Sequence, residues 1–139
     1  MKNIIFHCSD SSWGNAAEIT KWHLERKFST IGYHFVILNG WTAQGYFDSD
    51  YDGHIETGRN PEQEGSHTLG HNDAIGICLI GKSKLFTDKQ IEGAEELLDK
   101  LHTRYGEIRL YQHSDFDANK YFCAGLDLSA WRRLYEKGS

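Results

Sequence analysis

The feature that most constrains the fold is an uninterrupted apolar segment from Ile75 to Ile80, with the sequence Ile-Gly-Ile-Cys-Leu-Ile. A run this short, rich in β-branched residues and without polar positions, is typical of a strand and not of a helix. Because neither face of such a strand carries polar groups, both faces must be covered. The sequence therefore predicts a central strand in a sheet that has helices on both sides.

Three further segments predict strands of the same sheet, at residues 4–6, 33–38 and 108–112. The second of these is followed by Asn39-Gly40, a strong signal for a tight turn. Residues 41–73 show no clear period, so functional loops with short strand pieces are expected there. Within them, residues 46–53 resemble an extra loop that either lines a substrate groove or forms a solvated turn.

Helices are predicted between these strands. Asn15 is expected to cap the first one. Thr87 and Gln90 form a capping box at the start of the longest one, because each side chain can bond to the other residue's backbone N–H. A last amphipathic helix contains Leu128, Trp131 and Leu134. Strands that alternate with helices indicate the α/β class, and 139 residues are enough for a single domain spanning residues 1–139.

Composition excludes several functional classes. Fifteen basic and 20 acidic residues give a net charge of −5, and no basic run is present, so we expect no nucleic-acid partner. No apolar stretch approaches the ~20 residues of a membrane span, and the first residues become polar too soon for a signal peptide. Three cysteines without a Cys-x-x-Cys pair suit a reducing compartment. We expect synthesis in the cytoplasm and no insertion into a membrane.

Two histidines are placed for chemistry, because His7 and His113 each follow a predicted strand and precede a polar turn. Cys123 lies ten residues beyond His113. Two imidazoles and one thiolate suit a catalytic zinc ion that keeps its fourth position open. The alternative is structural, with the histidines capping strand ends and Cys123 packed as a small hydrophobic residue. From the spacing alone, that alternative is the more common outcome.

A second histidine pair, His67 and His71, has the four-residue spacing that binds zinc on one face of a helix. Gly65 and Gly70 flank the two histidines, and a helix is not expected there. The pair is therefore the weaker candidate for a metal site.

A series of short motifs occurs in one order along the chain: His7-Cys8-Ser9, Trp22-His23, Gly32-Tyr33-His34-Phe35-Val36-Ile37, Gly58-Arg59, Gly65-Ser66-His67, Gly70-His71-Asn72, residues 75–81, Phe86-Thr87 with Gln90, His113, Lys120, Cys123 and Leu126-Asp127. In this order they resemble the zinc-dependent N-acetylmuramoyl-L-alanine amidases, and within them the phage amidase-type lysozymes. The resemblance extends from Ile4 to about Lys137. It implies a central mixed β-sheet flanked by helices, the amidase and peptidoglycan-recognition fold.

The resemblance also implies roles for individual residues. It assigns a Zn²⁺ ion to His7, His113 and Cys123, and catalytic roles to Tyr33 and Lys120. The implied reaction is hydrolysis of the amide between N-acetylmuramic acid and L-alanine of the stem peptide. The Tyr33 hydroxyl and the Lys120 ammonium would stabilise the negative charge of the tetrahedral intermediate. From the residues alone, Tyr33 could equally pack at a strand edge and Lys120 be a solvated charge.

The same resemblance places Arg59, His67 and Asn72 along the groove that holds the muropeptide. Arg59 could bind a stem-peptide carboxylate through two hydrogen bonds, or equally form a structural ion pair. Relatives that recycle cell wall carry a glutamate where this chain has Cys78, so Cys78 is expected in the core.

The leading hypothesis is a monomeric phage or prophage endolysin whose partner is peptidoglycan, acting on the periplasmic cell wall after release. A secreted interbacterial amidase toxin would have the same chemistry. A non-catalytic peptidoglycan-binding module is the alternative from another class, and Cys123 argues against it because such relatives typically lack the ligand cysteine. Some phage relatives also contact RNA polymerase, which nothing in this sequence tests.

Overall fold

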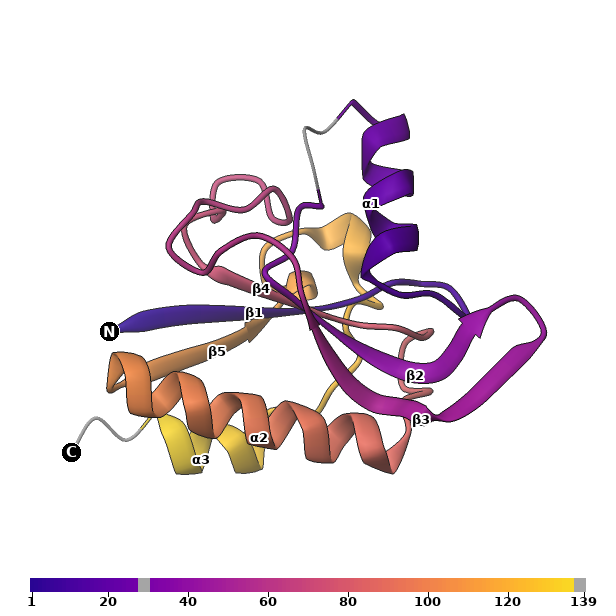
Figure 1. The fold of residues 1–139 in the computed structure, drawn as a ribbon. Coiled ribbons are helices and arrows are strands. Elements are labelled where there is room, and N and C mark those ends of the chain that lie inside the picture. Colours follow the sequence, from indigo (N-terminus) through magenta and orange to yellow (C-terminus); the bar gives the residue numbers. More distant parts are fainter. Residues whose placement is uncertain (28–30, 137–139) are drawn as a thin grey trace.

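The computed structural model describes residues 1–27 and 31–136. Lys137 and the last two residues of the predicted domain lie outside this range. Five strands and three α-helices are present in the described part (Figure 1): β1 Lys2–Cys8, α1 Ala16–Glu25, β2 Phe35–Ala43, β3 Tyr46–Thr57, β4 Ile75–Leu79, α2 Asp88–Tyr105, β5 Ile108–Gln112 and α3 Ser129–Tyr135. None of these helices has both the length and the apolar character needed to cross a bilayer.

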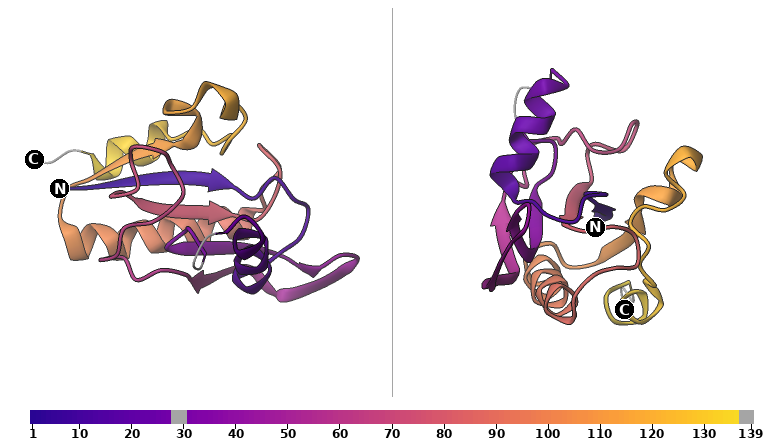
Figure 2. Two further views of the ribbon diagram at one scale, coloured as in Figure 1. Left: turned by 90° about the horizontal axis from the view of Figure 1, so that it is seen from above. Right: turned by 90° about the vertical axis from the view of Figure 1, so that its right-hand side faces the viewer.

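The strands form one mixed sheet in the order β3-β2-β4-β1-β5. β1 pairs in parallel with β4 and with β5, β2 pairs in parallel with β4, and β3 pairs antiparallel with β2. Helix α1 lies on one face of the sheet and α2 and α3 on the other (Figures 1 and 2). The predicted α/β class, with a mixed sheet flanked by helices, is confirmed.

Strand β4 is central and completely buried, as its apolar sequence predicts. Ile75, Ile77 and Leu79 pack in the larger core, which α2 and α3 cover. Cys78 and Ile80 belong to a second cluster on the opposite face, beneath α1. Because side chains alternate between faces along a strand, the two cores together account for the absence of polar residues in this segment.

The predicted turn at Asn39-Gly40 is wrong. Both residues lie inside β2, where the register with β3 shifts on either side of Asn39. The Asn39 side chain stabilises this irregular part of the strand. Its Oδ1 accepts from the backbone N–H of Trp41, and its Nδ2 donates to the carbonyl of Ser12. A bulge thus absorbs the turn-forming pair, and the chain reverses instead at 44–45.

The expected loops over residues 41–73 are only partly present, because residues 46–57 form the long strand β3. The segment proposed as an extra loop is therefore one half of a hairpin that projects beyond the sheet (Figure 1). Its polar and aromatic residues lack an apolar period because β3 is an edge strand, largely exposed to solvent.

One strand boundary and one core residue also differ from the prediction. The second strand begins at Phe35, so Tyr33 precedes it. In α3, Leu134 is 66% exposed, and Tyr135 packs in the core with Leu128 and Trp131 instead.

The start of α2 is fixed by Gln90, which is completely buried. The predicted capping box with Thr87 is confirmed. The Gln90 side-chain Nε2 also donates to the carbonyls of Ile37 (3.1 Å) and Ile80 (2.7 Å). One side chain therefore connects α2 to β2 and to the end of β4.

We predict that Gln90→Leu lowers the free energy of unfolding by about 2–4 kcal/mol, because two buried carbonyls lose a donor. Thr87→Ala, which removes the cap and the hydroxyl's bond to Asp52, should cost about 1–2 kcal/mol. Denaturant unfolding measures both. Equal losses for the two variants would show that the bonds to the strands contribute nothing.

Candidate metal centre

The sheet register brings two histidines together at one edge. β1 and β5 are parallel, and Phe6 is paired with Gln112. The next residue of each chain is therefore His7 on β1 and His113 at the start of a short 3₁₀ helix, His113–Asp115. The loop that follows returns Cys123 to the same place, where its Sγ accepts a hydrogen bond from the backbone N–H of Cys8 at 3.1 Å.

These three side chains form a compact group of potential metal ligands. One ligand atom from each of His7, His113 and Cys123 lies within 4.8 Å of the others, and the described part of the chain contains no other such group of three or more. Nδ1 of His7 lies 3.2 Å from Nδ1 of His113. Two imidazoles bound tetrahedrally to zinc would have their nitrogens about 3.3 Å apart. The donor set and its spacing therefore fit a zinc ion.

The electrostatics of the group also suit a metal. His7 is 1% exposed, and burial, together with the neighbouring His67 and His113, lowers its pKa well below the usual value. His7 is therefore neutral, the form that binds metals. Without a metal, the Cys8 side chain and burial raise the pKa of Cys123. A bound cation would oppose this shift, because it stabilises the thiolate.

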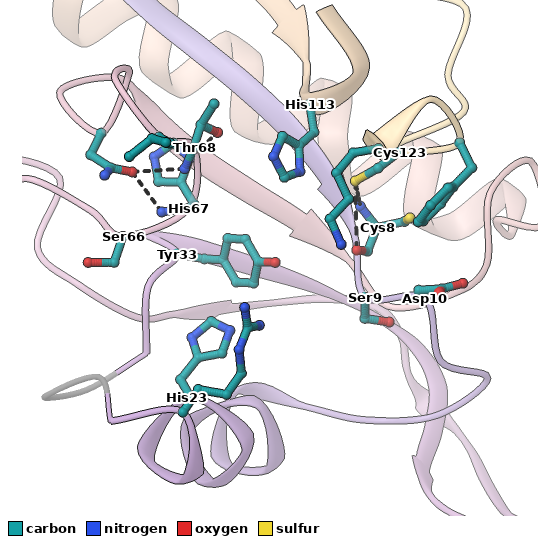
Figure 3. Close-up of a pocket in the computed structure, with 15 residues that line it drawn as sticks. Cys8, Ser9, Asp10, His23, Tyr33, Ser66, His67, Thr68, His113 and Cys123 are labelled. Atoms are coloured by element: carbon teal, nitrogen blue, oxygen red, sulfur yellow. Dashed lines mark hydrogen bonds between the residues drawn. The ribbon is translucent and has the colours of Figure 1, made fainter. Parts of the chain in front are cut away.

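A cavity of about 470 Å³ opens beside the group, and His113 and Cys123 form part of its lining (Figure 3). The Tyr33 ring reaches across this cavity toward Cys8 and Cys123, with its centroid 5.0 Å from that of His7. Burial, followed by the nearby Cys78, Cys123 and Cys8 side chains, raises the pKa of Tyr33. Its hydroxyl therefore keeps its proton and can act as a donor.

Lys120 also lines the cavity, at the end of a second 3₁₀ helix, Ala118–Lys120. Its side chain is exposed, and its Nζ lies 5.8 Å from the centre of the Phe122 ring. Its carbonyl accepts from the N–H of Cys123 at 3.0 Å. The backbone thus fixes Lys120 close to the ligand cysteine, with its charge at the cavity mouth.

The three predicted substrate contacts differ in position. His67 and Asn72 line the cavity, whereas Arg59 is not among its lining residues. The Arg59 guanidinium donates to the carbonyls of Ile31 and Glu64, each at 2.8 Å. These bonds stabilise the loop that follows β3. A contact of Arg59 with substrate stays a prediction.

The His67 and His71 rings face different neighbours. His71 stacks on Phe116 with centroids 4.0 Å apart, while His67 packs edge-on against His7. The loop between them is not helical, so the spacing argument for a second metal site does not apply.

His23 occurs in the sequence motif Trp22-His23, which assigns it no role in the site. In the structure, His23 and Arg26 at the end of α1 also line the cavity. His23 accepts from the N–H of Gly32 through Nδ1 at 2.8 Å. Burial, with the charges of Arg26 and Arg59, lowers its pKa to about 4. The Trp22-His23 motif of the resemblance was the one signal that pointed to this helix end.

Comparison with known proteins identifies the family of the chain. A family model described as N-acetylmuramoyl-L-alanine amidase matches residues 1–123. The chain belongs to the N-acetylmuramoyl-L-alanine amidase family. A curated endolysin of Enterobacteria phage T3 is 33% identical over 139 residues, which cover 92% of this chain and 83% of that protein. The matched range, residues 1–123, contains all three candidate ligands and both candidate catalytic residues.

Solved structures share this fold over nearly all of the chain. An N-acetylmuramoyl-L-alanine amidase, LysC from Clostridium intestinale URNW, superposes with a TM-score of 0.77 and 25% identity, over 96% of this chain and 83% of that one. Peptidoglycan recognition protein LE, solved in complex with tracheal cytotoxin, has a TM-score of 0.70 at 21% identity, over 98% of this chain and 77% of that one. The second similarity concerns the fold alone.

The buried histidines predict an acid-sensitive fold. His23 binds a proton near pH 6.5 when unfolded but only at about pH 4 when folded. The contribution of His23 to the free energy of unfolding, about 3 kcal/mol, is therefore fully present above pH 6.5 and is lost as the pH falls toward 4. His23→Asn, whose Oδ1 can still accept from Gly32, should flatten the decline. Denaturant unfolding of chelator-treated protein at several pH values measures it, and superimposable profiles would contradict the assignment.

Proposed function

We propose that this amidase-family chain hydrolyses the amide between N-acetylmuramic acid and L-alanine of peptidoglycan stem peptides, and that it needs zinc to do so. The observation that carries the proposal is the His7–His113–Cys123 group at the edge of a cavity that Tyr33 and Lys120 also line. Membership of the N-acetylmuramoyl-L-alanine amidase family supports this reaction.

The two imidazoles and the thiolate would hold the ion, leaving the cavity side for substrate. When bound, zinc supplies Lewis acidity, which polarises an amide carbonyl. The chain supplies the surroundings of the ion: the buried His7 stays neutral, and the N–H of Cys8 donates to the sulfur of Cys123.

Tyr33 and Lys120 are proposed to act on the substrate itself. Hydrolysis requires a water molecule to attack the amide carbon, after which the C–N bond breaks and the amine leaves with one of the water's protons. The attack places negative charge on the amide oxygen, and a donor already in position stabilises this charge without reorganising. The protonated Tyr33 hydroxyl supplies one hydrogen bond from inside the cavity. The Lys120 ammonium supplies positive charge from the cavity mouth, where it can also meet the departing amine.

We further propose that the chain is a phage or prophage endolysin. The similarity to the endolysin of phage T3 supports this role, and the complex of recognition protein LE with a peptidoglycan fragment supports a muropeptide as occupant of the groove. The proposed site of action is the periplasmic cell wall after release from the cytoplasm, and the proposed form is a monomer. The presence of Cys123 in the ligand group supports an enzyme over a non-catalytic binding module.

Digestion of purified peptidoglycan tests the proposal, with products identified by mass spectrometry. We expect free stem peptides that begin with the amino group of L-alanine, lost after chelation and restored by added zinc. Intact peptidoglycan under every condition would contradict the proposed activity, and products unaffected by chelation would contradict only the metal dependence.

We predict that Tyr33→Phe lowers kcat by about 10²–10³-fold with unchanged zinc content, because it removes one donor to the developing oxyanion. Tyr51→Phe, on the exposed strand β3, is the matched control and should keep full activity. The dye-release rate from labelled peptidoglycan measures both. A Tyr33→Phe enzyme as active as the control would exclude the proposed role.

We predict that Cys123→Ser abolishes zinc retention and hydrolysis while leaving the fold intact. A serine hydroxyl does not ionise to a ligand as a thiol does, whereas its volume fits the same buried space. Metal analysis after gel filtration and circular dichroism measure the two effects. A folded variant that still retains one zinc ion would contradict the assignment of this ligand.

A further inference from the structure

The His67 ring lies directly behind the candidate ligand His7. The two rings meet edge-on at 85°, with centroids 5.0 Å apart. We propose that His67 is a positioning residue, which fixes the hydrogen on one nitrogen of His7 and so directs the other nitrogen toward the metal. This inference rests on the proposed metal centre. It replaces the substrate contact that the resemblance implies for His67.

The contacts of His67 determine which of its nitrogens carries hydrogen. Its Nε2 lies 2.9 Å from the carbonyl oxygen of Ala74. A carbonyl only accepts, so this nitrogen must carry the hydrogen. In the neutral imidazole the other nitrogen, Nδ1, is then an acceptor.

That acceptor faces His7. Nε2 of His7 lies 3.0 Å from Nδ1 of His67 and 3.2 Å from Oγ1 of Thr68. Facing a fixed acceptor, His7 carries its hydrogen on Nε2, and its lone pair is on Nδ1. That atom is the one 3.2 Å from Nδ1 of His113. Metal-binding histidines are commonly oriented by such a partner on the second nitrogen.

The fold holds the His67 ring in this place through Gly76. A Cβ at Gly76 would lie 2.6 Å from Cδ2 and 2.7 Å from Cγ of His67, so the ring rests directly on the backbone of β4. A Cβ at Gly65 would lie 2.5 Å from the same Cδ2. Glycine inside a strand weakens it and marks the close approach of another group. Here that group is the His67 ring, which explains the one glycine in the central apolar strand.

The loop that carries His67 is also braced. Oδ1 of Asn72 accepts from the backbone N–H groups of both His67 and Thr68, each at 2.8 Å. Both ring nitrogens of His67 are already engaged, one with His7 and Thr68, the other with Ala74. Neither nitrogen is left for a substrate, which favours positioning over substrate contact.

The test measures metal binding, not activity alone. Zinc affinity is determined by competition with a chromophoric chelator, and the visible spectrum of the Co²⁺ form reports the ligand geometry. His67→Ala should bind zinc about 10–100-fold more weakly and shift the Co²⁺ bands. His67→Asn, which can present Oδ1 to His7, should recover part of the affinity. His71→Ala, in the same loop, is the matched control and should match the wild type.

Gly76→Ala provides a second route to the same result. The added methyl group displaces the His67 ring without removing it, so zinc affinity should fall as it does in His67→Ala. Because both changes break one contact, the double variant should bind no more weakly than the single ones. Circular dichroism confirms that each variant is folded.

The outcomes separate the two proposals. A wild-type protein that binds neither zinc nor Co²⁺ would overturn the metal centre and this inference with it. Wild-type binding with equal affinity and spectrum in folded His67→Ala would overturn the positioning role alone. An unchanged zinc affinity with a raised KM would return His67 to substrate binding.

Discussion

The parallel pairing of β1 with β5 is the constraint on which the site depends. Its register sets Phe6 opposite Gln112 and so places His7 beside His113 at the carboxyl edge of the sheet. Backbone hydrogen bonds along both strands fix this position, and the buried side chains of β1 on the two faces prevent a shift of register. Two potential ligands are thus held on rigid elements, and a loop has to supply only the third, Cys123.

The neighbouring strand β4 supports the site because Gly76 has no side chain. Its apolar residues supply both cores, while Gly76 leaves the space that the His67 ring occupies. The same strand therefore stabilises the sheet and supports the imidazole behind His7. The candidate ligands therefore lie at the carboxyl edge of the sheet, which is where ligands commonly bind in parallel α/β folds.

Much of the fold and of the candidate site was predictable from the sequence. The uninterrupted apolar run predicted the central strand, the capping box predicted the start of α2, and the ordered motifs predicted the family and the three candidate metal ligands. The hairpin β2–β3 was not predictable, because Asn39-Gly40 sits in a bulge that side-chain bonds stabilise, and an edge strand has little apolar alternation. The role argued for His67 depends on its contact with His7, 60 positions away in the sequence, which no local pattern encodes. Tyr33 and Lys120 came from the resemblance, since tyrosine and lysine alone predict no chemistry.

X-ray absorption at the zinc edge of the metal-loaded protein tests the central claim most directly. The account predicts one sulfur ligand at about 2.3 Å and two imidazole nitrogens at about 2.0–2.1 Å, with the sulfur signal absent from Cys123→Ser. A first shell of nitrogen and oxygen alone in the wild-type protein would contradict it.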